Sequence, residues 1–168
     1  MSVVDTTDSP DDCVPRPLVT AMRWWHLSAV AELEGQVFGP TAWTLEQFYG
    51  ELAADRWLRV AVAAGQVVGY ADVAVAGHDS DLMTIAVAPT HRRSGLGGEL
   101  LDRAVAAAAE SGAHRMILEV RADNPAVGLY RSRGFERIDV RRDYYGPGAD
   151  ALVMRRRISD DDAVAHVR

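Results

Sequence analysis

The residues best suited to chemistry lie in one run, Arg92-Arg93-Ser94-Gly95-Leu96-Gly97-Gly98. Its glycines let backbone amides approach a ligand with no side chain in the way. A helix is predicted to follow, and its N-terminus would direct free N–H groups and the positive end of its dipole at the same place. The run therefore predicts an anion site suited to a pyrophosphate, with Arg92 and Arg93 adding positive charge beside it.

Other phosphate-binding patterns fit this run less well. A Walker loop ends in Lys-Ser/Thr, but all 18 basic residues of this chain are arginines. A dinucleotide fingerprint has glycine at the last position of G-x-G-x-x-G, where this chain has Leu100. An acidic residue does lie about twenty residues further on, so dinucleotide binding stays open on the pattern alone. An ordinary helix start with convenient glycines is the third alternative.

The elements expected around this run are a mixture of helices and strands. Apolar residues at helical spacing predict helices over 27–37, 96–108 and 126–132. Apolar β-rich runs predict strands over 19–24, 58–63, 67–75, 82–87, 116–121 and 151–158. Gly134 interrupts the chain before 136–145, whose end, with Tyr144 and Tyr145, is expected in a late strand or loop. A further helix is expected after Thr44, which can form a capping box with Gln47. Because strands first follow one another and then alternate with helices, we expect an α+β domain with a mixed sheet.

Composition is typical of a single globular domain. With 168 residues, of which 48% are hydrophobic, we expect one domain over 18–158, between a flexible acidic tail (1–17) and a charged tail (159–168). The formal net charge of −6 argues against direct nucleic-acid binding and permits a basic peptide as partner.

No segment approaches the roughly 20 apolar residues of a membrane span. A single cysteine, Cys13, and an acidic N-terminus unlike a secretory signal favour the cytoplasm. The histidines and acids show no metal-ligand spacing, so no metal is expected.

Several segments together resemble the GNAT superfamily of N-acetyltransferases. The arginine- and glycine-rich run matches the family's R/Q-x-x-G-x-G/A motif and follows an apolar strand and Pro89. The other matching segments are Trp43 to Phe48, Thr84 to Pro89, Leu118 to Asn124, Leu129 to Phe135, Arg141 to Tyr145 and Asp150 to Met154. The last four are similar to the type that acetylates the N-terminal alanine of ribosomal proteins (RimI type). The resemblance covers roughly residues 19–158 and implies a central mixed, mostly antiparallel sheet flanked by about four helices.

The resemblance implies acetyl-coenzyme A (acetyl-CoA) as co-substrate. Coenzyme-binding roles fall on the backbone of Ile85, Ala86 and Val87, on Arg92, Arg93, Ser94, Gly95, Leu96, Gly97 and Gly98 around the pyrophosphate, and on Asn124. Residues that would line the peptide site are Trp43, Tyr144 and Tyr145. The expected substrate is a protein N-terminus, with alanine of a small-subunit ribosomal protein as the leading candidate.

The reaction that the resemblance implies is attack of a neutral α-amine on a thioester. Glu119 resembles the general base that removes the proton of the amine, and Tyr130 resembles the general acid that protonates the leaving thiolate. Taken without the family, Glu119 would be a solvated strand residue paired with an arginine, and Tyr130 would be a core tyrosine at helical spacing.

One departure from the family concerns the spacing of Asn124 and Tyr130. The family usually places the asparagine seven residues before the tyrosine, whereas here the separation is six, so one residue is missing near Pro125. Two other functions stay open: acetylation of a small-molecule amine, and a non-catalytic coenzyme A sensor. The late Arg-Arg-x-Tyr-Tyr run argues against the first, and the presence of both Glu119 and Tyr130 argues against the second.

Overall fold

The computed structural model describes residues 16–54 and 56–164. The expected acidic tail, 1–17, therefore lies outside the described residues except for Arg16 and Pro17. No helix in the described part of the chain is long and apolar enough to cross a membrane.

Seven strands form one sheet in the order β1-β2-β3-β4-β5-β7-β6. They are β1 (Leu18–Ala21), β2 (Trp57–Ala63), β3 (Gln66–Ala76), β4 (Asp79–Val87), β5 (Arg115–Arg121), β6 (Glu136–Arg141) and β7 (Ala151–Arg157). Neighbouring strands are antiparallel except β4 and β5, which are parallel. The expected α+β class with a mixed, mostly antiparallel sheet is confirmed.

Five α-helices accompany the sheet within the described residues: α1 (Leu27–Phe38), α2 (Leu45–Ala53), α3 (Leu96–Glu110), α4 (Ala126–Ser132) and α5 (Asp160–Val164). Short 3-10 turns lie at Trp24–His26, Gly39–Thr41 and Pro89–His91. As the sequence predicts, Thr44 and Gln47 form a reciprocal capping box at the start of α2, with N–H···O distances of 2.8 and 3.3 Å.

Helix α5 forms in the segment that was expected to be a charged tail. Its start is stabilised locally, because the Asp162 carboxylate accepts hydrogen bonds from the backbone N–H and the hydroxyl of Ser159. Asp162 also pairs with Arg156 at the end of β7. Three aspartates in the first turn favour the positive end of the helix dipole. Part of the charged segment therefore forms the Arg156–Asp162 ion pair and the hydrogen bonds to Ser159. Helix α5 packs against α3.

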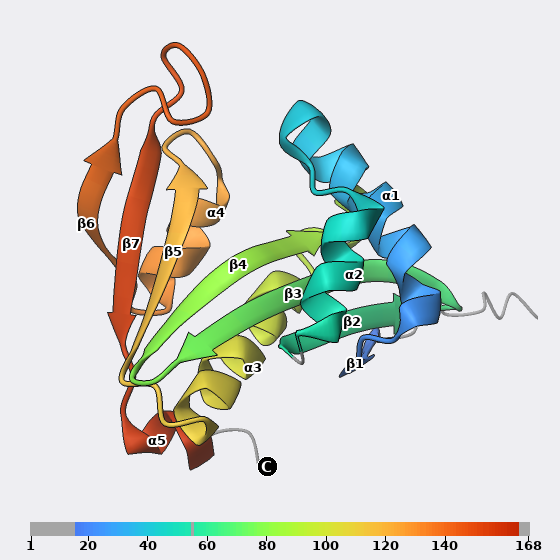
Figure 1. Cartoon of the computed structure of the whole chain (residues 1–168), viewed down its shortest axis with the longest axis horizontal. Helices are drawn as coiled ribbons and strands as arrows, with labels where there is room; N and C mark the ends of the chain where they lie inside the picture. Colours follow the sequence, from blue (N-terminus) through green and yellow to red (C-terminus); the bar gives the residue numbers. More distant parts are fainter. Residues whose placement is uncertain (1–15, 55, 165–168) are drawn as a thin grey trace, which may run out of the picture.

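The two faces of the sheet are covered by different helices. One core cluster joins α1 and α2 to Val60, Tyr70 and Ala86 of the sheet. The others join α3 and α4 to the opposite face through residues such as Val73 and Met116. Figure 1 shows α2 in front of the sheet and α3 behind it.

Strands β4 and β5 separate along their length. Their paired register covers only Asp79–Asp81 with Arg115–Ile117. Figure 1 shows the two strands side by side where they begin and increasingly far apart toward their ends. Beyond that point, residues 85–87 of β4 remain paired with β3 on their other side. The divergence divides the molecule into an arm that carries α1 and α2 and an arm that carries β5, β7 and β6.

Candidate functional site

The glycine-rich turn links the end of β4 to the start of α3. Gly95 adopts a left-handed backbone conformation (φ +88°), which glycine tolerates at low cost. The first intrahelical hydrogen bond runs from the Glu99 N–H to the Gly95 carbonyl at 3.0 Å. The amides of Leu96, Gly97 and Gly98 precede that bond, as at any helix N-terminus, so they can donate to an anion.

The arginines of the turn lie beside this helix start. Arg92 is exposed, and its Nε lies 3.4 Å from the carbonyl oxygen of Val87 at the end of β4. Arg93 is also exposed and has a positive φ of 65°. Ser94 donates its hydroxyl to the His91 carbonyl at 2.7 Å, which closes the turn. The backbone and charges of this turn fit the pyrophosphate of a coenzyme.

Gly98 has a packing role that the motif does not reveal. A Cβ at Gly98 would lie 2.5 Å from Nη2 of Arg133. That guanidinium is held by Asp102 through two hydrogen bonds of 3.0 and 3.3 Å. The absence of a side chain at Gly98 therefore leaves room for Arg133, which connects the end of α4 to α3.

Asn124 lies two residues before helix α4 and accepts hydrogen bonds from its first turn. Its side-chain oxygen accepts a hydrogen bond from the Ala126 N–H at 2.8 Å, and its carbonyl accepts from the Val127 N–H at 3.1 Å. Pro125 follows with a helical φ of −56°. The segment between Asn124 and Tyr130 is therefore almost entirely helix. The contact of Asn124 with the coenzyme stays a prediction, and its Oδ1 is already engaged in this cap.

Glu119 lies on β5 with a side chain 27% exposed. Its Oε1 is 2.5 Å from Nη1 of Arg141, at the end of β6. Hydrogen bonding to Glu119 raises the pKa of Tyr144, and the Arg141 guanidinium lies 5.4 Å from the centre of the Tyr144 ring. Arg121, two residues further along the same strand, is paired with Asp123 and not with Glu119. The carboxylate thus meets the late Arg-Arg-x-Tyr-Tyr run.

Tyr130 is buried on α4, with 6% of its surface exposed, and it packs edge-on against Phe135. Burial raises its pKa to about 12, and the neighbouring Tyr145 contributes in the same direction. Tyr145 is itself half-buried, and burial together with the charge of Glu119 raises its pKa. Tyr145 therefore interacts electrostatically with both Glu119 and Tyr130.

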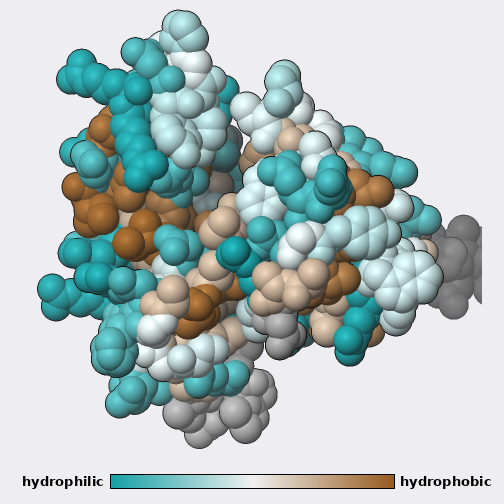
Figure 2. All heavy atoms as spheres, viewed as in Figure 1, coloured by the Kyte–Doolittle hydropathy of each residue, from teal (hydrophilic) through white to brown (hydrophobic). Residues whose placement is uncertain are grey.

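Trp43 lies on the other arm of the molecule. It is half-buried between α1 and α2 and packs against Phe48 with ring centres 5.5 Å apart. Its backbone N–H donates to Oε1 of Glu34 at 3.0 Å. Figure 2 shows that the surface is indented between this arm and the arm that carries β5 to β7. Trp43 and the Glu119 group thus belong to opposite sides of the divergence between β4 and β5.

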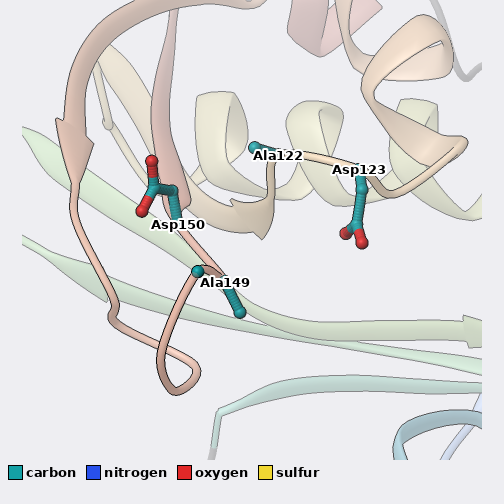
Figure 3. A pocket seen from close by; sticks show the side chains of 5 residues that line it. Ala122, Asp123, Ala149 and Asp150 are labelled. Carbon is teal, nitrogen blue, oxygen red and sulfur yellow. The ribbon is translucent and has the colours of Figure 1, made fainter.

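A small pocket of about 120 Å³ lies between the segment after β5 and the segment before β7. It is lined by Ala122, Asp123, Gly148, Ala149 and Asp150 (Figure 3). Both acidic side chains are already engaged, because Asp123 pairs with Arg121 and Asp150 accepts from the Asp143 N–H at 2.9 Å. The pocket contains neither Glu119 nor Tyr130, so we place the reaction centre outside it.

Two residues near this site carried no assigned role in the sequence reading. Arg141 was part of a recognised motif, but nothing in its spacing reveals its contact with Glu119. Glu34 interrupts the apolar stripe of α1, between Val30 and Val37, and is 2% exposed. An acidic residue at an apolar position of a helix is the signal that identifies it.

Comparisons with known proteins show what the chain is similar to. The model of the acetyltransferase (GNAT) family matches residues 8–135. The chain is 41% identical over 138 residues to the N-alpha-acetyltransferase RimI of Mycobacterium tuberculosis, covering 77% of this chain and 85% of that protein. It is 35% identical over 140 residues to a putative ribosomal protein bS18-alanine N-acetyltransferase of Bacillus subtilis, covering 81% and 92%.

A further relative and a solved structure extend the comparison. An uncharacterized protein of Mycobacterium leprae is 44% identical over 138 residues, and the matched region spans about a third of its length (36%). The crystal structure of the ribosomal-protein-S18-alanine N-acetyltransferase from Escherichia coli superposes with a TM-score of 0.76 at 28% identity, covering 85% of this chain and 94% of that one.

Proposed function

The chain belongs to the GNAT acetyltransferase family, and on this premise we propose that it transfers the acetyl group of acetyl-CoA to the α-amino group of a protein N-terminus. The leading substrate is alanine at the start of a small-subunit ribosomal protein. The names of the Bacillus and Escherichia relatives support that choice.

One observation carries the proposal. Arg141 pairs with Glu119 and lies over the ring of Tyr144, which packs against Tyr145, on the arm opposite Trp43 beside the divergence of β4 and β5. This arrangement supports a site in which the peptide enters between the two arms and the coenzyme approaches from the glycine-rich turn. When bound, acetyl-CoA supplies a thioester carbonyl as the acceptor of the amine.

The proposed work of Glu119 is to take a proton from the α-ammonium group. An α-amino group has a pKa of about 7.7–8.0, so only modest help is required at neutral pH. Before the peptide binds, the carboxylate pairs with Arg141. Because the Glu119 side chain is 27% exposed, the amine can reach it directly or through a water molecule.

The proposed work of Tyr130 is to donate toward the sulfur of the leaving group. With a pKa of about 12, its hydroxyl stays protonated throughout the neutral range. A thiol has a reference pKa of about 8.5. Complete proton transfer from this phenol to a thiolate is therefore uphill, and the hydrogen bond itself stabilises the developing negative charge.

The charge of the molecule supports a basic peptide. The formal net charge is −6, and the acidic side chain of Asp81 on β4 is exposed and electrostatically coupled to Glu119. An excess of negative charge raises the encounter rate with cationic partners. Protein N-termini that are followed by arginine or lysine should be preferred over acidic ones.

The test uses two synthetic peptides that begin with alanine and contain an internal lysine. One has a free α-amine, and the other is blocked at that amine. Release of coenzyme A thiol and mass spectrometry should show one acetyl group added to the free peptide and none to the blocked one. Equal acetylation of both peptides would assign the activity to lysine side chains. Turnover of a polyamine but of neither peptide would assign it to small amines.

The ribosomal target is tested separately. Mass spectrometry of small-subunit ribosomal proteins from cells with and without the active enzyme should show one N-terminal acetylation that depends on the enzyme. An unchanged set of modified N-termini would remove ribosomal proteins from the proposal while leaving peptide acetylation intact.

A further inference from the structure

Glu34 is a buried carboxylate that the proposed chemistry does not use. It lies on the apolar face of α1 with 2% of its surface exposed, beside Val30 and Leu33. Burial of a carboxylate is unfavourable unless hydrogen bonds replace its water. Here Oε1 accepts the Trp43 N–H at 3.0 Å, while Oε2 is buried and has no hydrogen-bond partner among the described residues. An apolar residue would pack at this position at lower cost, so a specific role needs to be found.

The neighbours of Glu34 lie in two segments of the candidate site. Trp43 lies in the segment between α1 and α2, on the arm opposite Glu119, and we call this segment the peptide-binding wall. Burial raises the pKa of Glu34, and the Trp43 amide and the nearby hydroxyl of Thr84 on β4 oppose that rise. The same hydroxyl lies 3.4 Å from the hydroxyl of Tyr70 on β3.

Thr84 directly precedes residues 85–87, the part of β4 that we expect to bind the coenzyme. The carboxylate of Glu34 therefore lies between the Trp43 segment, which it holds by a hydrogen bond, and the strand expected to bind the coenzyme. Trp43 N–H lies just before the capping box of Thr44, so Glu34 is the acceptor that holds this backbone. A shift of the segment would change the width of the opening toward Glu119.

We propose that Glu34 is a positioning residue for acetyl transfer, which fixes the Trp43 segment against β4 and thereby sets the peptide-binding wall. The inference rests on the proposed function. It requires that Glu34 affects peptide binding and leaves the binding of acetyl-CoA at the glycine-rich turn unchanged. A residue that only stabilises the fold would affect both substrates or neither.

The test compares Glu34→Leu with Glu34→Gln, and uses Glu32→Leu on the exposed side of α1 as the matched control. Leucine keeps the volume and removes the acceptor, so the KM for an alanine-initiated peptide should rise about tenfold. The KM for acetyl-CoA should remain unchanged. Glutamine keeps an oxygen for the Trp43 N–H and should restore the peptide KM to within about twofold, as should the Glu32 variant.

An unchanged peptide KM in Glu34→Leu would overturn the inference, as would an equal rise in the KM for acetyl-CoA. If the wild-type protein binds acetyl-CoA but acetylates no peptide, the proposed function fails, and this inference fails with it. Should Glu34→Leu not fold, Thr84→Val removes the hydroxyl that lies near the carboxylate on the β4 side. The same selective rise in peptide KM is expected there, and its absence would overturn the inference.

Discussion

The Glu119 carboxylate is shared between Arg141 and Tyr144, which come from the end of β6 and the segment after it. The Arg141 side chain is 50% exposed. Ion pairs with this degree of exposure contribute only about 0–1 kcal/mol. A peptide amine can therefore displace Arg141 at little cost, so the observed pairing is compatible with a general base.

Replacement of Glu119 by glutamine tests the base. Loss of general-base help typically lowers a rate by about 10²- to 10⁴-fold, and we expect the lower end because the α-amine loses its proton near neutrality without help. Activity should recover partly at high pH. The measurement is kcat/KM for the peptide against pH, with Glu136→Gln on the exposed part of β6 as control. Wild-type activity in Glu119→Gln would exclude the carboxylate from catalysis.

Replacement of Tyr130 by phenylalanine tests the acid. Because burial raises the pKa of Tyr130 to about 12, the hydroxyl is protonated at every practical pH. The turnover should fall by about 10²-fold or less, by the same factor from pH 6 to pH 9, with little change in peptide KM. Tyr49→Phe, at an exposed position of α2, is the control. Undiminished turnover while chemistry limits the rate would show that solvent protonates the thiolate.

At the scale of elements, helix α3 carries two left-handed glycines at its opposite ends. Gly95 (φ +88°) precedes the helix and Gly112 (φ +84°) follows it, and a Cβ at either position would meet open space. Both positions therefore impose similar backbone strain on any other residue. Only Gly95 lies at the proposed pyrophosphate site. A comparison of substitutions at the two positions therefore distinguishes the effect of backbone strain from a loss of coenzyme binding.

Leucine at Gly95 or Gly112 should lower the free energy of unfolding by a similar amount, about 1–2 kcal/mol. Acetyl-CoA at about 100 times its Kd stabilises a folded protein by about 2.7 kcal/mol. Thermal unfolding should show this gain in the wild type and in Gly112→Leu, and no gain in Gly95→Leu. Equal stabilisation of both variants would move the pyrophosphate site away from this turn. Stabilisation of the wild type by NAD instead would contradict the coenzyme assignment.

Helices α3 and α4 are connected where Arg133 lies over Gly98. Alanine at Gly98 must displace the guanidinium from Asp102, but that pair is more than one-third exposed on each side and contributes little. Alanine also favours the helix over glycine by about 1 kcal/mol. Urea unfolding should therefore show a change within about 1 kcal/mol. A larger loss would mean that Arg133 cannot move from its position over α3.

At the scale of the whole molecule, one buried acid lies on the face of the sheet that α1 and α2 cover. Asp72 is fully buried on β3, and within 16–54 and 56–164 neither of its carboxylate oxygens has a hydrogen-bond partner. Burial raises its pKa from 3.8 to about 7; the nearby Glu51 adds to the rise, and Arg56 opposes it. The folded protein therefore binds this proton more tightly than the unfolded chain does.

The sign of the pH effect follows from that difference. Above pH 4 the unfolded chain loses the proton of Asp72 while the folded protein keeps it, so stability falls up to about pH 7 and is constant beyond. The total loss is at most roughly 4 kcal/mol. Asp72→Asn should remove this dependence. Urea unfolding between pH 5 and pH 8 should show a gap between variant and wild type that changes with pH, while Asp161→Asn tracks the wild type. Parallel curves for Asp72→Asn would contradict the assignment.

The amino-acid sequence determined the local features of this protein because they depend on residues close together in the chain. Helix α4 spans the predicted residues, the Thr44–Gln47 capping box is present, and the glycine-rich turn has the left-handed backbone that it requires. The family motifs were equally local, and the family model matches the chain. Periodicity, capping and turn chemistry act within a few residues, so they can be read without the fold.

Tertiary structure decided which distant groups meet. Arg141 reaches Glu119 because β7 lies between β5 and β6 in the sheet, and the register of those strands sets the contact. The bridge from Glu34 to Trp43 depends on how α1 packs on β4, and the burial of Asp72 depends on the cover of the sheet. Contacts of this kind follow from the packing of whole elements, which the order of residues within one element does not specify.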